Sequence, residues 1–149
     1  MSLRAFKCGA NIIALSKNGQ KFGMTCAWST MLDYDKVGML LGSQSVTGKN
    51  IEIDDIVGVS SLSKDQKDIA LIFGDNHSDT FDKFANVKCI IKDNVILIDG
   101  AKVQMICKVR QILHLFEKSS DVFLVLEVIE SSSDTSKEFL SLDDVYPEK

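Results

Sequence analysis

Proline and histidine are both scarce in this sequence, and these shortages limit what the chain can be. The 149 residues include one proline, Pro147, and two histidines, His77 and His114. No proline-rich or low-complexity stretch marks a linker, and no internal repeat is visible. A chain of this length is large enough to bury its own core. We therefore expect one domain over residues 1–149.

Closely spaced cysteines are also missing. Cys8, Cys26, Cys89 and Cys107 lie far apart, without a CxxC pair and without a neighbouring histidine. Structural zinc sites and redox dithiols depend on close pairs of such ligands. We expect reduced, buried thiols that pack as small hydrophobic groups, and no metal site.

Basic patches and long apolar runs are absent as well. Lys and Arg number 17 against 21 Asp and Glu, which gives a net charge of −4. No stretch collects cations that could neutralise a nucleic-acid backbone. The longest apolar run, 122–128, contains Glu127 and is far shorter than the ~20 residues that cross a bilayer. The N-terminal residues do not resemble a signal peptide. We expect a cytoplasmic protein that binds neither nucleic acid nor membrane.

The remaining composition is that of an ordinary globular protein, and the pattern of residues along the chain predicts its elements. Hydrophobic residues make up 45% of the chain and charged residues 26%. Tight turns are expected at Asn18-Gly19 and Asp99-Gly100. A capping box formed by Ser63 and Gln66 predicts a helix over 63–73, and a helical turn is expected over 49–54. Alternating or continuous apolar residues predict strands over 8–16, 20–28, 36–41, 56–60, 87–92, 95–98, 103–112 and 122–129.

These elements predict a mainly β fold, a β-barrel with one or two short helices. The strand over 122–129 is apolar on both faces, so a second layer should cover its outer side. A second subunit would do so, and we expect a homodimer. The C-terminal tail over 131–149 is the alternative cover. This tail carries several apolar side chains and is expected to dock on the domain.

Three short segments carry the functional signal. Residues 24–28 read MTCAW, residues 43–50 form the hydroxyl-rich run SQSVTGKN, and residues 81–84 read FDKF. Their order and spacing resemble the flavin-reductase-like family of FMN-binding split barrels. The stretch 57–75 is similar to the strand and Gln-containing helix of the same family. The resemblance covers roughly residues 7 to 130.

The resemblance implies an FMN site with a ring-binding strand and a phosphate-binding turn. Strand amides and Thr25 would serve the edge of the flavin, and hydroxyls with a cation would serve its phosphate. Trp28 would cover apolar surface near the ring, with ordinary core packing as the alternative. The expected cofactor-binding residues are Met24, Thr25, Cys26, Ala27, Trp28, Ser43, Gln44, Ser45, Thr47, Lys49 and Lys83.

The implied activity is that of an NADH- or NADPH-dependent flavin reductase, which passes electrons to free flavin or another acceptor. No protein side chain is expected to act as acid, base or nucleophile, because the flavin carries the redox chemistry. Many relatives have Gly-Asp-His before their last strand, whereas this chain has Ser119, Ser120 and Asp121. This difference favours a second hypothesis, an FMN-binding electron carrier or storage protein without nicotinamide turnover. A third is a cofactor-free β-barrel interaction module whose hydroxyl-rich run is a solvated turn.

Overall fold

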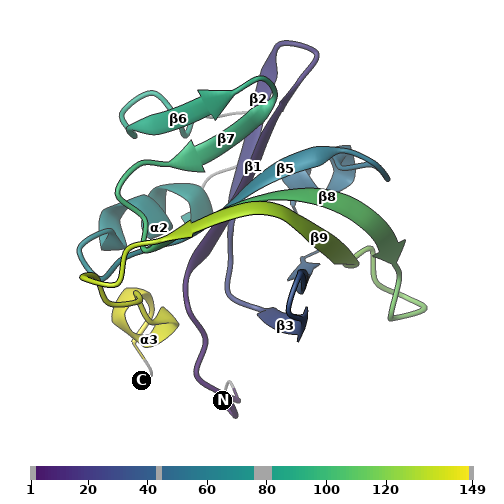
Figure 1. Ribbon diagram of the computed structural model, residues 1–149. Coiled ribbons are helices and arrows are strands. Elements are labelled where there is room, and N and C mark those ends of the chain that lie inside the picture. The colour runs from purple at the N-terminus through teal and green to yellow at the C-terminus, as the bar shows by residue number, and fades with distance from the viewer. Residues whose placement is uncertain (1–2, 43–44, 76–81, 148–149) are drawn as a thin grey trace.

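The computed structural model describes residues 3–42, 45–75 and 82–147, which form one antiparallel sheet and three short helices (Figure 1). The helices are α1 (Val46–Asn50), α2 (Lys67–Asp75) and α3 (Leu142–Val145). The strands are β1 (Asn11–Lys17), β2 (Gln20–Cys26), β3 (Ser29–Asp33), β4 (Lys36–Leu41), β5 (Ile56–Ser61), β6 (Cys89–Lys92), β7 (Val95–Ile98), β8 (Val103–Leu113) and β9 (Val122–Ser133). The predicted mainly β fold is confirmed, with three described helices instead of one or two.

The sheet branches at its first strand. Its main path is β3-β4-β9-β8-β5-β1-β7-β6, and β2 pairs with β1 from the side. β1 therefore has three partner strands, β2, β5 and β7. In the described part of the chain the two ends of this path do not meet, so the sheet is curled but not closed.

The β1–β2 hairpin forms as its turn residues predict. Asn18 and Gly19 have φ values of 53° and 78°, the left-handed conformation that a type I′ turn requires at both positions. This turn sets a register in which Asn11 pairs with Cys26 and Lys17 with Gln20. The end of β2 is thereby placed beside the start of β1.

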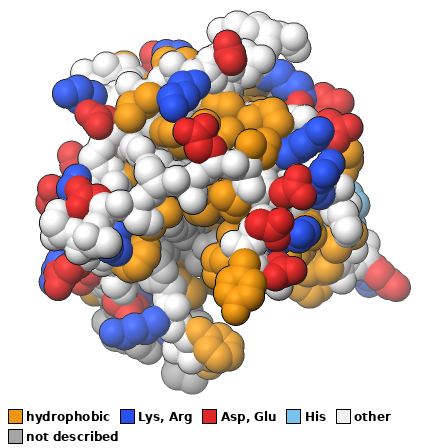
Figure 2. Space-filling model, viewed as in Figure 1, with side chains coloured by type: hydrophobic (Ala, Val, Ile, Leu, Met, Phe, Trp, Pro, Cys, Tyr) orange, Lys and Arg blue, Asp and Glu red, His pale blue; other side chains and the backbone are white. Residues whose placement is uncertain are grey.

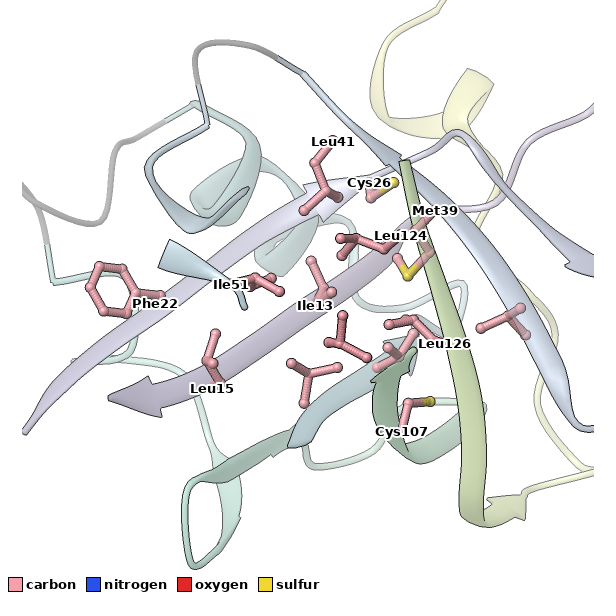
Figure 3. Packing of buried hydrophobic residues seen from close by; sticks show 14 residues of the cluster. Ile13, Leu15, Phe22, Cys26, Met39, Leu41, Ile51, Cys107, Leu124 and Leu126 are labelled. Carbon is pink, nitrogen blue, oxygen red and sulfur yellow. The ribbon is translucent and has the colours of Figure 1, made fainter. Parts of the chain in front are cut away.

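Two hydrophobic clusters lie on opposite sides of this hairpin. Ile13 and Leu15 of β1 belong to the barrel cluster, which the curled sheet surrounds (Figure 3). Ile12 and Ala14 belong to the α2 cluster, which also contains Phe73 of α2. Successive side chains of a strand point to opposite faces, so one continuous apolar strand supplies both clusters. This explains why the sequence of β1 does not alternate.

The C-terminal tail docks against the start of the chain. Leu140 is buried, its N–H donates to Leu62 O, and its carbonyl accepts from Ala10 N. A capping box of Ser141 and Asp144 then starts α3. Both chain ends lie at the same end of the molecule in Figure 1.

Several predicted strands begin or end a few residues away from their observed bounds, β9 extending to Ser133, and three elements differ in kind or position. β3 was not expected, and all five of its residues are exposed, so it lacks the buried alternation that marks a strand. α1 lies at 46–50 instead of 49–54 because Ser45 accepts a hydrogen bond from Gly48 N and caps it. α2 begins at Lys67, since the Ser63 hydroxyl donates to Asp65 and to Gly100 O. Only the Gln66 half of that capping box forms.

The described surface mixes both signs of charge. On the face seen in Figure 2, acidic and basic side chains alternate around apolar ones instead of gathering by sign. Within the described ranges, no group of three or more His, Cys, Asp or Glu side chains could hold a metal ion. None of the helices described for this chain has the length and apolar character needed to span a membrane.

Candidate functional site

The strand that carries the MTCAW segment presents different chemistry on its two faces. Met24 and Cys26 face the barrel cluster, Met24 half-buried and Cys26 buried. Thr25 faces the other way, and its hydroxyl donates to Ala70 O of α2 at 2.7 Å. Thr25 is therefore engaged with the helix in this structure. Its expected role at the flavin edge stays a prediction.

The hydroxyl-rich run meets this strand through one side chain. The Ser45 hydroxyl lies 2.7 Å from Met24 Sδ, and it accepts from Gly48 N at 2.8 Å. A thioether sulfur is a weak acceptor. The hydroxyl could therefore turn to a stronger acceptor, such as a phosphate oxygen, at small cost. Strand end and turn, about twenty residues apart in sequence, are in direct contact.

The other described residues of the run differ in exposure. Thr47 is buried inside α1, with 1% of its surface exposed, whereas Lys49 is exposed in the last turn of the helix. Ser43 and Gln44 lie outside the described residues, as does Phe81 of the FDKF segment. Ser45 is therefore the hydroxyl whose position supports the predicted phosphate site most directly.

Cys26 is a buried thiol beside the candidate site. It is 3% exposed, and its Sγ lies 3.3 Å from Leu40 O. Figure 3 shows it next to Met39 and Leu41 at one end of the barrel cluster. Burial raises the pKa of the Cys26 thiol to about 12. The side chain thus stays protonated near neutral pH and supplies packing instead of a nucleophile.

Trp28 is not a core residue, so the core-packing alternative is wrong. Its side chain is 64% exposed, while its backbone carbonyl accepts from Leu40 N at 2.9 Å. Ala27, the residue before it, is half-buried and accepts from Ser29 N. Trp28 lines a groove of about 430 Å³ together with Phe6, Cys8 and Leu142. An exposed indole at this place is available to cover an apolar ligand surface.

Asn11 supports the end of the strand, and no sequence pattern indicated this role. Its side-chain amide donates to Cys26 O at 3.1 Å and to Ser29 Oγ at 2.8 Å. Its side-chain oxygen accepts from the Ser61 hydroxyl at 2.7 Å. One buried amide thus joins β1, β2, β3 and β5 behind the candidate site. Asn11 begins an apolar strand, and from the sequence a polar residue at this position indicates only where the strand starts.

Lys83 does not join the hydroxyls of the turn. Its amine donates to Gly23 O at 2.6 Å and to Phe73 O at 3.0 Å, and the residue is only 4% exposed. Gly23 lies on the face of β2 that packs against α2, and Phe73 belongs to α2. The structure therefore brings Met24 and Ser45 into contact, places Cys26 on the same face of β2 as Met24, and gives Lys83 other partners. Its expected contact with a phosphate stays a prediction.

No imidazole stands at residues 119–121, directly before the last strand. Ser119, Ser120 and Asp121 stand there, and Asp121 N donates to the Ser119 hydroxyl at 3.1 Å. His114 is exposed just beyond β8, and His77 lies outside the described residues. The segment offers hydroxyl and carboxylate groups where many relatives have Gly-Asp-His.

The fold and this site can be compared with known proteins. NADH:FAD oxidoreductase SgcE6 of Streptomyces globisporus is similar with a TM-score of 0.81 at 20% identity, over 94% of this chain and 84% of that one. A putative flavin reductase of Haemophilus somnus has a TM-score of 0.82 at 14% identity, over 94% and 89%. Flavoredoxin of Methanosarcina acetivorans has a TM-score of 0.78 at 12% identity, over 95% and 88%. At these identities the structures establish the fold alone.

The sequence itself supplies the assignment to a family. No curated protein matches this chain. The family model for the flavin reductase like domain matches residues 3–144, which include β1 to β9 and the tail up to α3. The resemblance drawn from the MTCAW segment, the hydroxyl-rich run and the FDKF segment is thereby confirmed. The protein belongs to the flavin reductase-like domain family.

Proposed function

We propose that this protein binds FMN and reduces it with NADH or NADPH, acting as a flavin reductase. The observation that carries the proposal is the contact between Ser45 and Met24, which joins the strand end to the hydroxyl-rich turn. Membership of the family and the SgcE6 relative, also solved with NAD and FAD fragments, support a flavin and a nicotinamide as ligands.

The residues of the candidate site fit a flavin in three respects. Within the described ranges, the acceptor of the Ser45 hydroxyl is the weakly accepting sulfur of Met24, so a phosphate oxygen can replace it. Trp28 offers an exposed apolar face, and buried Cys26 and Met39 make a firm floor behind the strand. Bound flavin would supply hydride and electron transfer, while these side chains would position it and exclude water. We propose no protein acid or base.

Absorbance and binding measurements test the proposal. Addition of FMN should give a one-to-one complex with a shifted flavin spectrum, and anaerobic NADH or NADPH should bleach it. Ser45→Ala combined with Thr47→Ala should weaken FMN binding tenfold or more, because the bond of the Ser45 hydroxyl to a charged group alone would contribute about 1.5 to 3 kcal/mol. Riboflavin, which lacks the phosphate, should lose less affinity than FMN.

A matched control is available at α3. Ser141 caps that helix as Ser45 caps α1, so Ser141→Ala removes a comparable cap from a helix that does not carry the hydroxyl-rich run. This variant should bind FMN like the wild type. Unchanged FMN affinity in the Ser45/Thr47 double variant would refute the phosphate assignment. A chain that never takes up FMN, FAD or riboflavin would refute the flavin function and favour the cofactor-free module.

A second candidate function is an FMN-binding electron carrier or storage protein. Ser119 to Asp121 in place of Gly-Asp-His favours it, since no imidazole is available there to meet a nicotinamide. Under this candidate the protein binds FMN but neither NADH nor NADPH bleaches it, whereas dithionite does. Stopped-flow reduction with both nicotinamides distinguishes the two functions.

We also propose that the protein is a homodimer. Phe123 of β9 lies across Gly38 of β4, with Leu32 of β3 beside it, and the outer face of β9 remains only half-buried. Exposed Leu32 on the adjoining edge strand β3 extends this apolar surface. Sedimentation should give about twice the 16.5 kDa chain mass. A monomer at micromolar concentration would contradict the dimer and leave the FMN proposal standing.

A further inference from the structure

Lys83 is a buried cation with an unusual pair of partners. Its amine contacts two backbone carbonyls, Gly23 O in β2 and Phe73 O near the C-terminal end of α2. The same amine lies 5.9 Å from the centroid of the Phe73 ring. One side chain from the loop after α2 thus connects a strand and a helix far apart in the sequence.

No carboxylate in the described part of the chain pairs with this amine. The neighbouring Asp82 accepts from Phe84 N, and Asp75 accepts from the Tyr146 hydroxyl. Burial lowers the pKa of Lys83 to about 8. The carbonyl at the end of α2 offers the partial negative charge of a helix C-terminus, which stabilises a cation there. The amine is therefore satisfied without a phosphate.

β2 needs such an attachment because, among the described strands, only one of its two edges is hydrogen-bonded to a neighbour. The strand pairs with β1 and with no other described strand. Its α2-facing positions have little side chain to bury, since Gly23 lies against Phe73 and Phe84, where an added Cβ would come within 2.8 Å of both rings. Two hydrogen bonds attach this face in addition: Thr25 donates to Ala70 O of α2, and the Lys83 amine donates to Gly23 O.

We propose that Lys83 is a positioning residue that holds the flavin-binding strand β2 against α2, and not a ligand of the flavin phosphate. The proposal rests on the flavin function proposed above. Gly23, the carbonyl that Lys83 holds, immediately precedes Met24, which contacts Ser45. Loss of the amine should therefore loosen the strand end that receives the ring, and phosphate recognition by Ser45 should be left as it is.

Comparison of FMN with riboflavin tests the proposal. Lys83→Met keeps most of the alkyl chain and removes the donor, and Lys83→Arg keeps both charge and donors. Lys83→Met should weaken FMN and riboflavin by the same factor, about tenfold, so that the ratio of their dissociation constants is unchanged. Lys83→Arg should recover most of the affinity. Loss confined to FMN, or no loss for either ligand, would overturn the proposal.

Lys21 gives the matched control. It is exposed on the same strand, with its amine 5.9 Å from the Phe84 ring centroid. Lys21→Met removes one positive charge from this neighbourhood without touching the two carbonyls. It should leave the affinity for both ligands unchanged. An equal loss in Lys21→Met and Lys83→Met would show a general charge effect and would also overturn the proposal.

Two measurements do not depend on the Lys83→Met variant binding flavin. In the wild type, a buried ammonium exchanges slowly with water, so its ¹H–¹⁵N signal can be followed below pH 8. That signal should respond alike to FMN and riboflavin, and a response to FMN alone would overturn the proposal. Hydrogen exchange of the Met24 to Cys26 amides should be faster in Lys83→Met than in Lys21→Met. This difference in exchange is expected whether or not flavin binds. A failure to bind flavin would refute only the proposed flavin function.

Discussion

The two faces of β2 are attached to the protein by different means. On the barrel side, Phe22 and Cys26 are buried among the apolar side chains of β1, β4 and β9. On the α2 side, Gly23 contributes no side chain and Thr25 contributes a hydroxyl that binds the helix backbone. The first face is held by burial of apolar surface, and the second by hydrogen bonds from side chains to carbonyls.

This difference shows how an edge strand can be fixed and still be open to a ligand. Apolar packing tolerates small shifts of a strand, whereas a donor that meets a carbonyl at 2.6 to 3.0 Å sets its position more narrowly. On the barrel side β2 is thus held by packing, and on the α2 side its position is also set by hydrogen bonds to carbonyls. Substitutions on the two faces should therefore differ in their effects on stability, on its pH dependence and on flavin binding.

The largest effect is expected from Phe73→Ala in α2. Phe73 is 1% exposed and makes an edge-to-face contact with Phe84 at a centroid distance of 5.0 Å. Removal of a fully buried ring should lower the free energy of unfolding by about 3 to 5 kcal/mol. Urea denaturation measures this loss. A cost below about 1 kcal/mol would mean that the α2 cluster contributes little and would break the comparison.

Gly23→Ala should have the next largest effect. The added methyl group would lie 2.8 Å from both Phe73 and Phe84 and would force these rings apart. Overpacking of this kind costs about 1 to 3 kcal/mol. Gly42→Ala is the control, because an added Cβ there has no atom within 4 Å and the φ angle is not left-handed. Equal thermal stability of the two variants would contradict the tight α2 side.

The pH dependence of stability should also separate the two faces. The pKa of Lys83 is lowered to about 8 from 10.5, so above pH 8 the unfolded chain holds more protons than the folded one. The penalty of the buried charge is complete below pH 8 and is relieved as pH rises. Burial raises the pKa of Cys26 and Cys107 to about 12 from 9.0, so their contribution is complete below pH 9 and declines above it.

Stability should therefore increase between pH 8 and 9 and fall at higher pH. The slope is at most about 1.4 kcal/mol per pH unit for each proton. Lys83→Met should abolish the increase and retain the fall. Urea midpoints measured from about pH 7.5 to 10 check both statements. If the stability of Lys83→Met still increases between pH 8 and 9 as in the wild type, the increase must come from another titrating group.

The smallest effect is expected from Cys26→Ala on the barrel side. Loss of one buried sulfur should cost about 1 kcal/mol in stability and some FMN affinity. Reduction of bound flavin by nicotinamide should persist, because the raised pKa keeps this thiol protonated. Cys107→Ala in β8 is a control for sulfur loss away from the site. Normal FMN binding without reduction would show that Cys26 takes part in the chemistry.

Local patterns explain which parts of the fold could be predicted from the sequence. The Asn18-Gly19 turn and the apolar strands around it follow from neighbouring residues, and the structure confirms them. β3 could not be found in this way, because an exposed edge strand lacks the burial that produces alternation. The helical turn α1 lies earlier in the chain than predicted because Ser45 caps it, and apolar periodicity gives no indication of such a cap.

The candidate site shows the same limit at longer range. Residues 24–28 and Ser45 could be joined from the sequence because the family resemblance brings them together. The partners of Lys83 could not, since they lie 60 and 10 residues away and depend on how α2 packs on β2. From the sequence alone, a lysine next to a phenylalanine is expected to be a cation at the surface. Only the packing of Phe73 and Phe84 shows that its amine is buried.

The branch at β1 has a consequence for the order in which the chain folds. The pairing of β1 with β2 closes across a two-residue turn and needs only residues 11–26. Its pairings with β5 and β7 wait for residues 58–61 and for Val95, and each must overcome a larger loop-closure entropy. The first hairpin to form is thus the template on which the later strands assemble. Amides of Ile13 and Ala14, enclosed from both sides in the finished sheet, should be among the last to exchange with solvent.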